Sequence, residues 1–100
     1  MKILALKREN STATQAQFQR YAKEEARAVW ELYHQGVMRE LYFRADQPTA
    51  VLVLECASTG EATTVLANLP LVKQGLVSFE LIPLAAYPGF ARLFGEEHVG

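Results

Sequence analysis

Apolar residues recur with two different periods along the chain, and each change of period marks a new structural element. Residues 1–7 hold a short apolar run that predicts a strand. From 15 to 35, apolar side chains recur every three or four positions, which predicts one long amphipathic helix. Residues 37–44 and 50–57 are rich in strand formers and flank the polar stretch ADQPT, so they predict a hairpin.

Both helices carry boundary signals. Thr14 begins a capping-box pattern with the glutamine three residues later, with Ser11 and Thr12 as alternative caps. Gly36 is placed to end the first helix in the left-handed conformation. Ser58 begins the same pattern with a glutamate three residues later. Apolar residues at helical spacing follow, so we expect a second amphipathic helix that Pro70 ends.

The last third of the chain adds one more strand and a terminal extension. Residues 76–83 are almost all apolar and predict the fourth strand. Pro83 lacks a backbone donor, which places it at the end of this strand or on a sheet edge. Residues 86–94 predict one or two terminal helical turns, and the final residues, with His98, predict a frayed tail to which we assign no function.

The order strand, helix, strand, strand, helix, strand predicts a ferredoxin-like α+β fold, βαββαβ. Right-handed crossovers place both helices on one face of a four-stranded antiparallel sheet, with the strands in the spatial order fourth, first, third, second. The third strand is then central, in agreement with its nearly continuous apolar sequence. We expect a single domain over residues 1–100, with residues 87–100 as a C-terminal extension.

Alternation gives each strand two faces without deciding which one is covered. In the first strand of the hairpin it places Arg39 and Leu41 on one face, and Met38, Glu40 and Tyr42 on the other.

Two helices cover only one sheet face, yet most residues of the other face are apolar as well. A soluble single chain does not expose such a surface. We therefore expect a second copy to pack sheet against sheet. The fourth strand of one chain approaches the second strand of its partner and closes an α+β barrel across the dimer. Glu80, in the middle of LVSFELIPL, then meets the partner's Arg39. Alternation also allows a simpler arrangement, in which Glu80 points to water from an edge strand.

Charge and cysteine content narrow the classes of partner. Ten Lys and Arg residues oppose eleven Asp and Glu residues, for a net charge of −1, whereas nucleic-acid binding needs a clustered positive face. The same balance argues against an anionic membrane surface. The single cysteine, Cys56, cannot form an intrachain disulfide, which fits a reducing compartment, and no apolar run is long enough to span a membrane. We expect a cytoplasmic protein that binds neither nucleic acid nor membrane.

Two acids interrupt apolar strands and are the first candidates for chemistry. Glu55 lies in the central third strand and Glu80 in the fourth. A carboxylate covered in such a strand has a raised pKa unless it is paired, which suits proton transfer. A solvated or hydrogen-bonded acid at a strand end is the alternative. Glu40 is a pocket residue or a solvated charge on an edge strand, and Tyr42 lines a pocket or completes the core.

Several other kinds of site are missing from the sequence. It has no metal-ligand spacing, no glycine-rich phosphate loop and no nucleophile motif with a suitable histidine. We expect no metal and no cofactor, which leaves acid–base chemistry or simple binding.

The stretches QGVMRELYFR, VLECAS and LANLPLV, followed by an acid-containing last strand, resemble the muconolactone isomerase family. The resemblance covers about residues 28–90, and the LPL segment after the second helix is its most telling part. This chain differs from the family member compared at Glu40, where that protein has a histidine. It also differs at Met38 and Tyr42, where that protein has tryptophans.

The resemblance implies a cofactor-independent proton shift on a small lactone acid, in aromatic catabolism, by a homodimer or higher homo-oligomer. By position it makes Arg39 the anchor for the substrate carboxylate and Glu55 the pocket acid. We thus expect Glu55 or Glu80 as the catalytic base, and Arg39, Glu40 and Tyr42 around the substrate. The alternatives are a non-catalytic module of the same fold, for metabolite binding or assembly, and a cofactor-free monooxygenase.

Overall fold

The computed structural model describes residues 1–95; residues 96–100, with His98, lie outside the described part. The order of elements confirms the βαββαβ prediction. The elements are β1 (Lys2–Glu9), α1 (Gln15–His34), β2 (Met38–Phe43), β3 (Ala50–Glu55), α2 (Thr59–Ala67), α3 (Pro70–Lys73), β4 (Val77–Leu84) and the 3-10 helix η1 (Gly89–Phe94).

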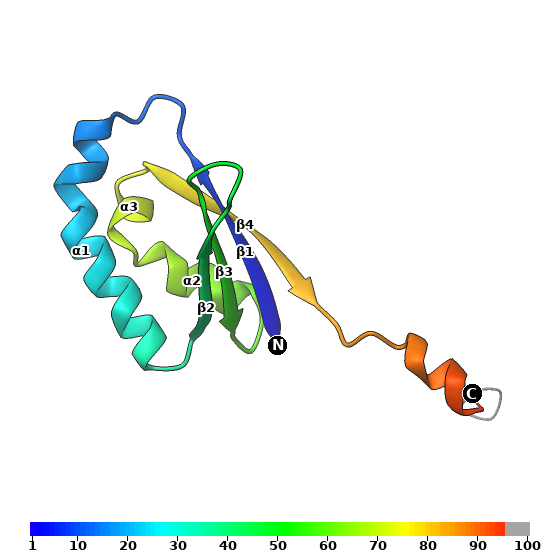
Figure 1. Ribbon diagram of the computed structural model, residues 1–100. Helices are drawn as coiled ribbons and strands as arrows, with labels where there is room; N and C mark the ends of the chain where they lie inside the picture. Colours follow the sequence, from blue (N-terminus) through cyan, green and yellow to red (C-terminus); the bar gives the residue numbers. More distant parts are fainter. Residues whose placement is uncertain (96–100) are drawn as a thin grey trace.

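The four strands form one antiparallel sheet in the order β2-β3-β1-β4, as predicted. The helices α1, α2 and α3 lie on one side of this sheet, and its other face is open (Figure 1). The core between sheet and helices consists of apolar side chains from both layers, chiefly Ile3, Ala5, Met38, Leu52, Leu54, Ala62, Leu66 and Leu69. Four of these eight residues come from β1 and β3, the two central strands.

The predicted boundaries of α1 are confirmed. The Thr14 hydroxyl accepts a hydrogen bond from the Gln17 backbone N–H at 3.2 Å, and the Gln17 side-chain oxygen accepts one from the Thr14 N–H at 2.8 Å. At the other end Gly36 has a φ of +81°, a left-handed conformation that glycine adopts without a steric cost. The helix is thus held at both ends by its local sequence.

The predicted faces of β2 are wrong for Met38, because the strand contains a bulge. The pairing with β3 shifts between Met38 and Glu40, so the strict alternation from residue 37 is broken there. Met38 pairs with Leu54 and is fully buried on the helix side, where Leu41 also lies. Glu40 and Tyr42 keep their common face, which is the open one.

The chain after α2 also differs from the prediction. Helix α2 ends at Ala67, and Pro70 opens the one-turn helix α3 instead of only closing α2. Proline is well suited to the first turn of a helix, where its missing N–H would have no partner. Pro83 lies in β4, an edge strand, as its missing donor requires.

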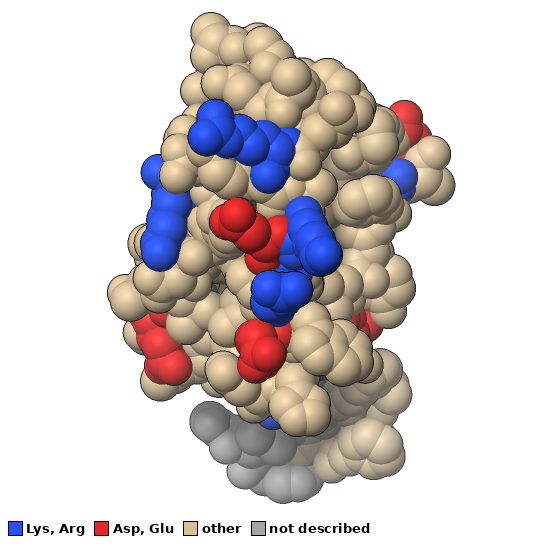
Figure 2. All heavy atoms as spheres, turned by 90° about the vertical axis from the view of Figure 1, so that its left-hand side faces the viewer, with Lys and Arg blue, Asp and Glu red and all other residues tan. Residues whose placement is uncertain are grey.

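No helix within residues 1–95 is long and apolar enough to cross a membrane. Seen from the α1 side, acidic and basic residues are interleaved, and no extended region of a single sign is visible (Figure 2).

Candidate functional site

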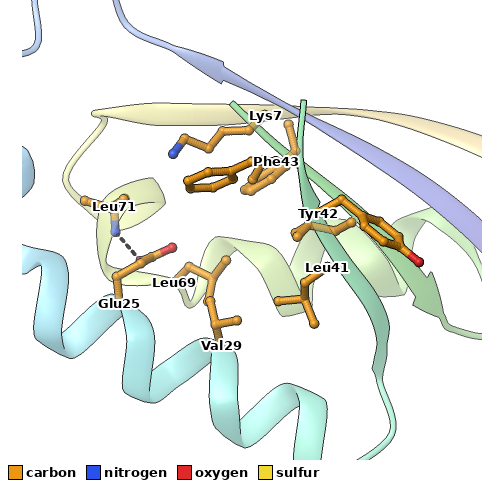
Figure 3. A pocket seen from close by; sticks show the side chains of 11 residues that line it. Lys7, Glu25, Val29, Leu41, Tyr42, Phe43, Leu69 and Leu71 are labelled. Carbon is orange, nitrogen blue, oxygen red and sulfur yellow. Dashed lines mark hydrogen bonds between the residues drawn. The ribbon is translucent and has the colours of Figure 1, made fainter. Parts of the chain in front are cut away.

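A pocket of about 370 Å³ opens between α1, α3 and the helix-side face of the sheet (Figure 3). Its walls are mostly apolar side chains from these elements, namely Val29, Leu41, Leu52, Leu69, Leu71 and Phe79. Two charged residues, Glu25 and Lys7, interrupt the apolar lining. A concave apolar site with a few polar groups is the usual form of a small-molecule pocket.

Glu25 projects from the middle of α1 and is held in place by α3. Its Oε1 accepts a hydrogen bond from the Leu71 backbone N–H at 3.0 Å, which satisfies a donor in the first turn of α3. Partial burial raises the pKa of the Glu25 carboxyl, and the Leu71 hydrogen bond and the Lys7 charge offset that rise only in part. A carboxylate with a raised pKa in an apolar pocket can both take up and return a proton.

Lys7 enters the same space from β1. It follows Ile3 and Ala5 at period two on the helix side of the sheet, so its side chain is largely covered, with 14% exposed. Figure 3 shows Lys7 and Glu25 reaching into the pocket from opposite layers. The Lys7 Nζ lies 3.8 Å from a carboxylate oxygen of Glu9 and 6.0 Å from the centre of the Phe18 ring. Lys7 is therefore the one basic residue in the lining of the pocket, and its ammonium already lies near the Glu9 carboxylate.

The predicted bases Glu55 and Glu80 lie on the open face of the sheet. A carboxylate oxygen of Glu55 is 2.6 Å from the Met1 ammonium, and this hydrogen bond is the main reason why the pKa of Glu55 is lowered. Glu80 accepts a hydrogen bond from Arg8. Both acids are therefore paired and partly open to solvent, with 40% of the Glu55 and 45% of the Glu80 side chain exposed, and neither faces the pocket that holds Glu25.

The register also separates the two predicted bases from each other. Glu55 pairs with Lys2 of β1 and Glu80 with Leu6, which are four residues apart along β1. At 3.3 Å per residue this is about 13 Å along the strand direction, before the width of the sheet is added. Within one chain they do not form a common site.

The three predicted substrate contacts lie on β2. Arg39, at the bulge, donates a hydrogen bond from its Nε to the Gly36 carbonyl. Tyr42 borders the pocket, but its hydroxyl points away and donates to the Glu40 carboxylate at 2.8 Å (Figure 3). That bond, together with the charge of Glu40, raises the pKa of Tyr42.

Sequence reasoning missed Glu25 and Lys7, although each leaves a signal. Glu25 lies between Tyr21 and Val29 on the apolar stripe of α1, so it is an acid on the covered side of an amphipathic helix. Lys7 continues the inward alternation of β1. Neither signal shows by itself that the two side chains line one pocket, because only the fold brings α1 and β1 together there.

Comparison with known proteins gives the family. The model of the muconolactone delta-isomerase family matches residues 4–89. This chain belongs to that family. Among curated proteins, none matches it. The family resemblance read from the LPL segment and its neighbours is thereby confirmed.

Two solved structures share the fold. A crystal structure of muconolactone isomerase aligns with a TM-score of 0.72 at 19% identity, covering 88% of this chain and 92% of that one. The 5-chloro-2-hydroxyhydroquinone dehydrochlorinase from Burkholderia phenoliruptrix, in complex with 2,5-dihydroxybenzoquinone, aligns with a TM-score of 0.65 at 16% identity, covering 89% of this chain and 98% of that one. At these identities the likeness establishes the α+β fold, and the chemistry depends on the residues of the pocket itself.

Proposed function

We propose that this member of the muconolactone delta-isomerase family catalyses a cofactor-independent proton shift on a small lactone acid. The observation that carries the proposal is the Glu25 carboxyl, whose pKa is raised in an apolar pocket where Lys7 is the facing charge. The family assignment supplies the reaction class.

In this reaction the Glu25 carboxylate takes a proton from a substrate carbon whose carbanion is conjugated with the lactone carbonyl, and the electron pair moves into the conjugated system. Negative charge develops on the carbonyl side, where a nearby cation lowers the barrier. The protonated Glu25 then returns the proton two atoms away. The C=C bond shifts, no atom is gained or lost, and Glu25 ends as it began.

Lys7 is the proposed partner for the negative charge of the substrate. The Lys7 side chain is mostly covered by protein, so its ammonium interacts with an anion more strongly than the ammonium of an exposed lysine does. A volume of about 370 Å³ suits a single small ring with substituents, near the lower end of ligand pockets. The dehydrochlorinase of this fold, which holds 2,5-dihydroxybenzoquinone, supports a substrate of that size and polarity.

We also propose a homodimer packed through the open sheet face. Apolar side chains that no helix covers run along the middle of that face and are only half-buried, namely Leu4, Leu6, Val51, Val53 and Ile82. In such a dimer Glu55, Glu80 and Arg39 form a second, rival set of site residues, in a chamber between the sheets. The two sets make different predictions for single substitutions.

The test is hydrogen exchange and turnover of muconolactone in D₂O, followed by proton NMR and by ultraviolet absorbance. An isomerase incorporates deuterium at the carbon that receives the proton from Glu25 and forms the shifted alkene. Muconolactone binding seen by NMR line broadening, with neither exchange nor turnover, supports the non-catalytic metabolite-binding alternative. Oxygen consumption on an electrode supports the monooxygenase alternative.

A further inference from the structure

Two neighbouring cavities lie between the sheet and the helices, and within residues 1–95 Phe79 of β4 is the one residue that lines both. The first is the pocket of about 370 Å³ that holds Glu25 and Lys7. The second, of about 200 Å³, lies between α2, α3 and the edge strand β4, and we call it the β4 cavity. Its lining is mostly apolar and includes Leu66, Ala67, Val72 and Leu81.

The Phe79 side chain points toward the helices and connects the two parts of the core. In steps of two along β4 it shares the helix side with Val77 and Leu81. It packs against the main core, which includes residues of α2, and also against the smaller cluster of Leu71, Leu76 and Val77. A side chain that contacts both clusters and lines both cavities forms the wall between the cavities.

This wall stands beside the cation that we assign to the substrate. Phe79 pairs with Lys7 in the antiparallel register of β4 and β1, and both side chains project on the helix side. Directly opposed residues of such strands have Cβ atoms about 4.5–5.5 Å apart. A substrate whose negative charge lies at Lys7 therefore presents its neighbouring ring atoms to the Phe79 ring.

We propose that Phe79 sets the size limit of the pocket: it excludes a lactone acid that carries an apolar group on the side facing Phe79, and shortening Phe79 opens the β4 cavity to that group. This inference rests on the proposed function, because it uses Lys7 to place the substrate. The β4 cavity, with about 200 Å³ and a mostly apolar lining, has room for a small alkyl group. Phe79 is thus a specificity-determining residue.

Phe79 is better placed for this role than the other apolar walls of the pocket. Leu52 and Leu69 are almost completely buried in the core, so shortening either removes packing together with the wall. Leu41 lies on the edge strand β2 and is 38% exposed, so the space beyond it is open to solvent. Phe79 is half-buried and faces an apolar hollow within the chain.

Binding of two lactone acids to the full chain tests the size limit. All variants carry Glu25→Gln, which prevents turnover. The ligands are muconolactone and an analogue with an ethyl group on the ring carbon next to the one that carries the carboxymethyl group, and dissociation constants are measured by NMR titration. We expect the analogue to bind at least about tenfold more weakly than muconolactone and to recover that loss in Phe79→Ala, since one methylene group in an apolar pocket is worth about 10–200-fold.

Leu81→Ala is the matched control, because Leu81 lies on the same face of β4 and lines the β4 cavity but not the pocket. Its shortening enlarges the cavity and leaves the Phe79 wall in place, so it should not improve binding of the analogue. Phe79→Leu keeps an apolar side chain in the core and should recover part of the binding, even where Phe79→Ala fails to fold. Equal binding of both ligands before Phe79 is changed overturns the proposal, as do no gain in the Phe79 variants and an equal gain in Leu81→Ala.

Benzene, an uncharged ligand, separates this inference from the proposed function. Apolar cavities left by shortened core side chains bind benzene. In Phe79→Ala, benzene should shift the amide resonances of Leu71, in the pocket, and of Leu66, in the β4 cavity; in Leu81→Ala it should not shift both. Shifts at one amide or at none in Phe79→Ala overturn the proposal. If neither lactone binds any variant, the proposed function fails, and the benzene result alone decides whether Phe79 is the wall.

Discussion

The two faces of the sheet place acids in very different surroundings. On the helix side, Glu25 reaches a mostly apolar pocket, and partial burial raises its pKa. On the open side, Glu55 and Glu80 stand among apolar strand residues, yet each is paired with a cation at the surface. The pKa of Glu55 is lowered as a result.

The difference shows that the position of an acid in an apolar strand does not by itself make it a base. A carboxylate becomes a useful base when a second layer of protein removes water from it. Helices α1 and α3 supply that layer on one face. On the other face no element of residues 1–95 supplies it, so any role of Glu55 and Glu80 as bases depends on the proposed dimer.

Glu25→Gln is expected to have the largest effect of any substitution. Glutamine keeps the oxygen that accepts from Leu71 but cannot take up a proton, so turnover should fall by about 10²–10⁴, the usual contribution of general acid–base catalysis. The rate on muconolactone is measured by ultraviolet absorbance. Glu80→Gln is the matched control and should retain most of the activity. The reverse ranking would move the site to the open face and favour the chamber between two sheets.

Val53→Glu is expected to have the next largest effect, on assembly. Val53 lies opposite Leu4 in the middle of the open face, so a charge there is buried in any sheet-to-sheet dimer and disfavours it by several kcal/mol. Sedimentation velocity should show single chains for Val53→Glu. Gln19→Glu adds the same charge on the exposed side of α1 and should leave the dimer intact. If the unaltered chain itself sediments as a single chain, the open face is not an interface.

The architecture could be predicted well from the sequence, because the fold depends on hydrophobic patterns and capping signals that recur along the chain. The period of 3.6 in α1, the continuous apolar run of β3 and the caps at Thr14 and Gly36 all agree with one another. Such mutually consistent signals leave few topologies open. The family could also be recognised from the sequence, because its motifs lie at element boundaries.

The site was harder to predict, because it depends on contacts between elements far apart in the chain. Glu25 is 46 residues from the Leu71 N–H that fixes it. The bulge in β2 moves Met38 to the covered face, and the alternating sequence pattern of the hairpin does not predict this bulge. Glu55 has a lowered pKa because of the Met1 ammonium, which the strand pattern could not reveal.

The raised pKa of Glu25 should also make the stability of the chain depend on pH. Because its folded pKa is raised above the ordinary value of 4.5, the folded state holds the Glu25 proton more tightly than the unfolded state. The contribution of Glu25 to the free energy of unfolding therefore falls as pH rises from 4.5 through the folded pKa, and is level above it. Glu25→Gln should remove this fall, as measured by urea denaturation across that range. Because a base must be ionised to act, kcat/KM should decrease toward low pH with an apparent pKa above 4.5.

Glu55 should show the opposite sign and the smallest effect. Its folded pKa is lowered by the Met1 ammonium, so its contribution to stability is present above pH 4.5 and is lost as pH falls through the folded pKa. Urea denaturation of Glu55→Gln should match the unaltered chain at low pH and fall slightly below it at neutral pH. Because the pair is exposed, added salt should narrow that gap. A gap that widens toward low pH would mean that Glu55 is covered in the assembled protein, and would return it to the list of candidate bases.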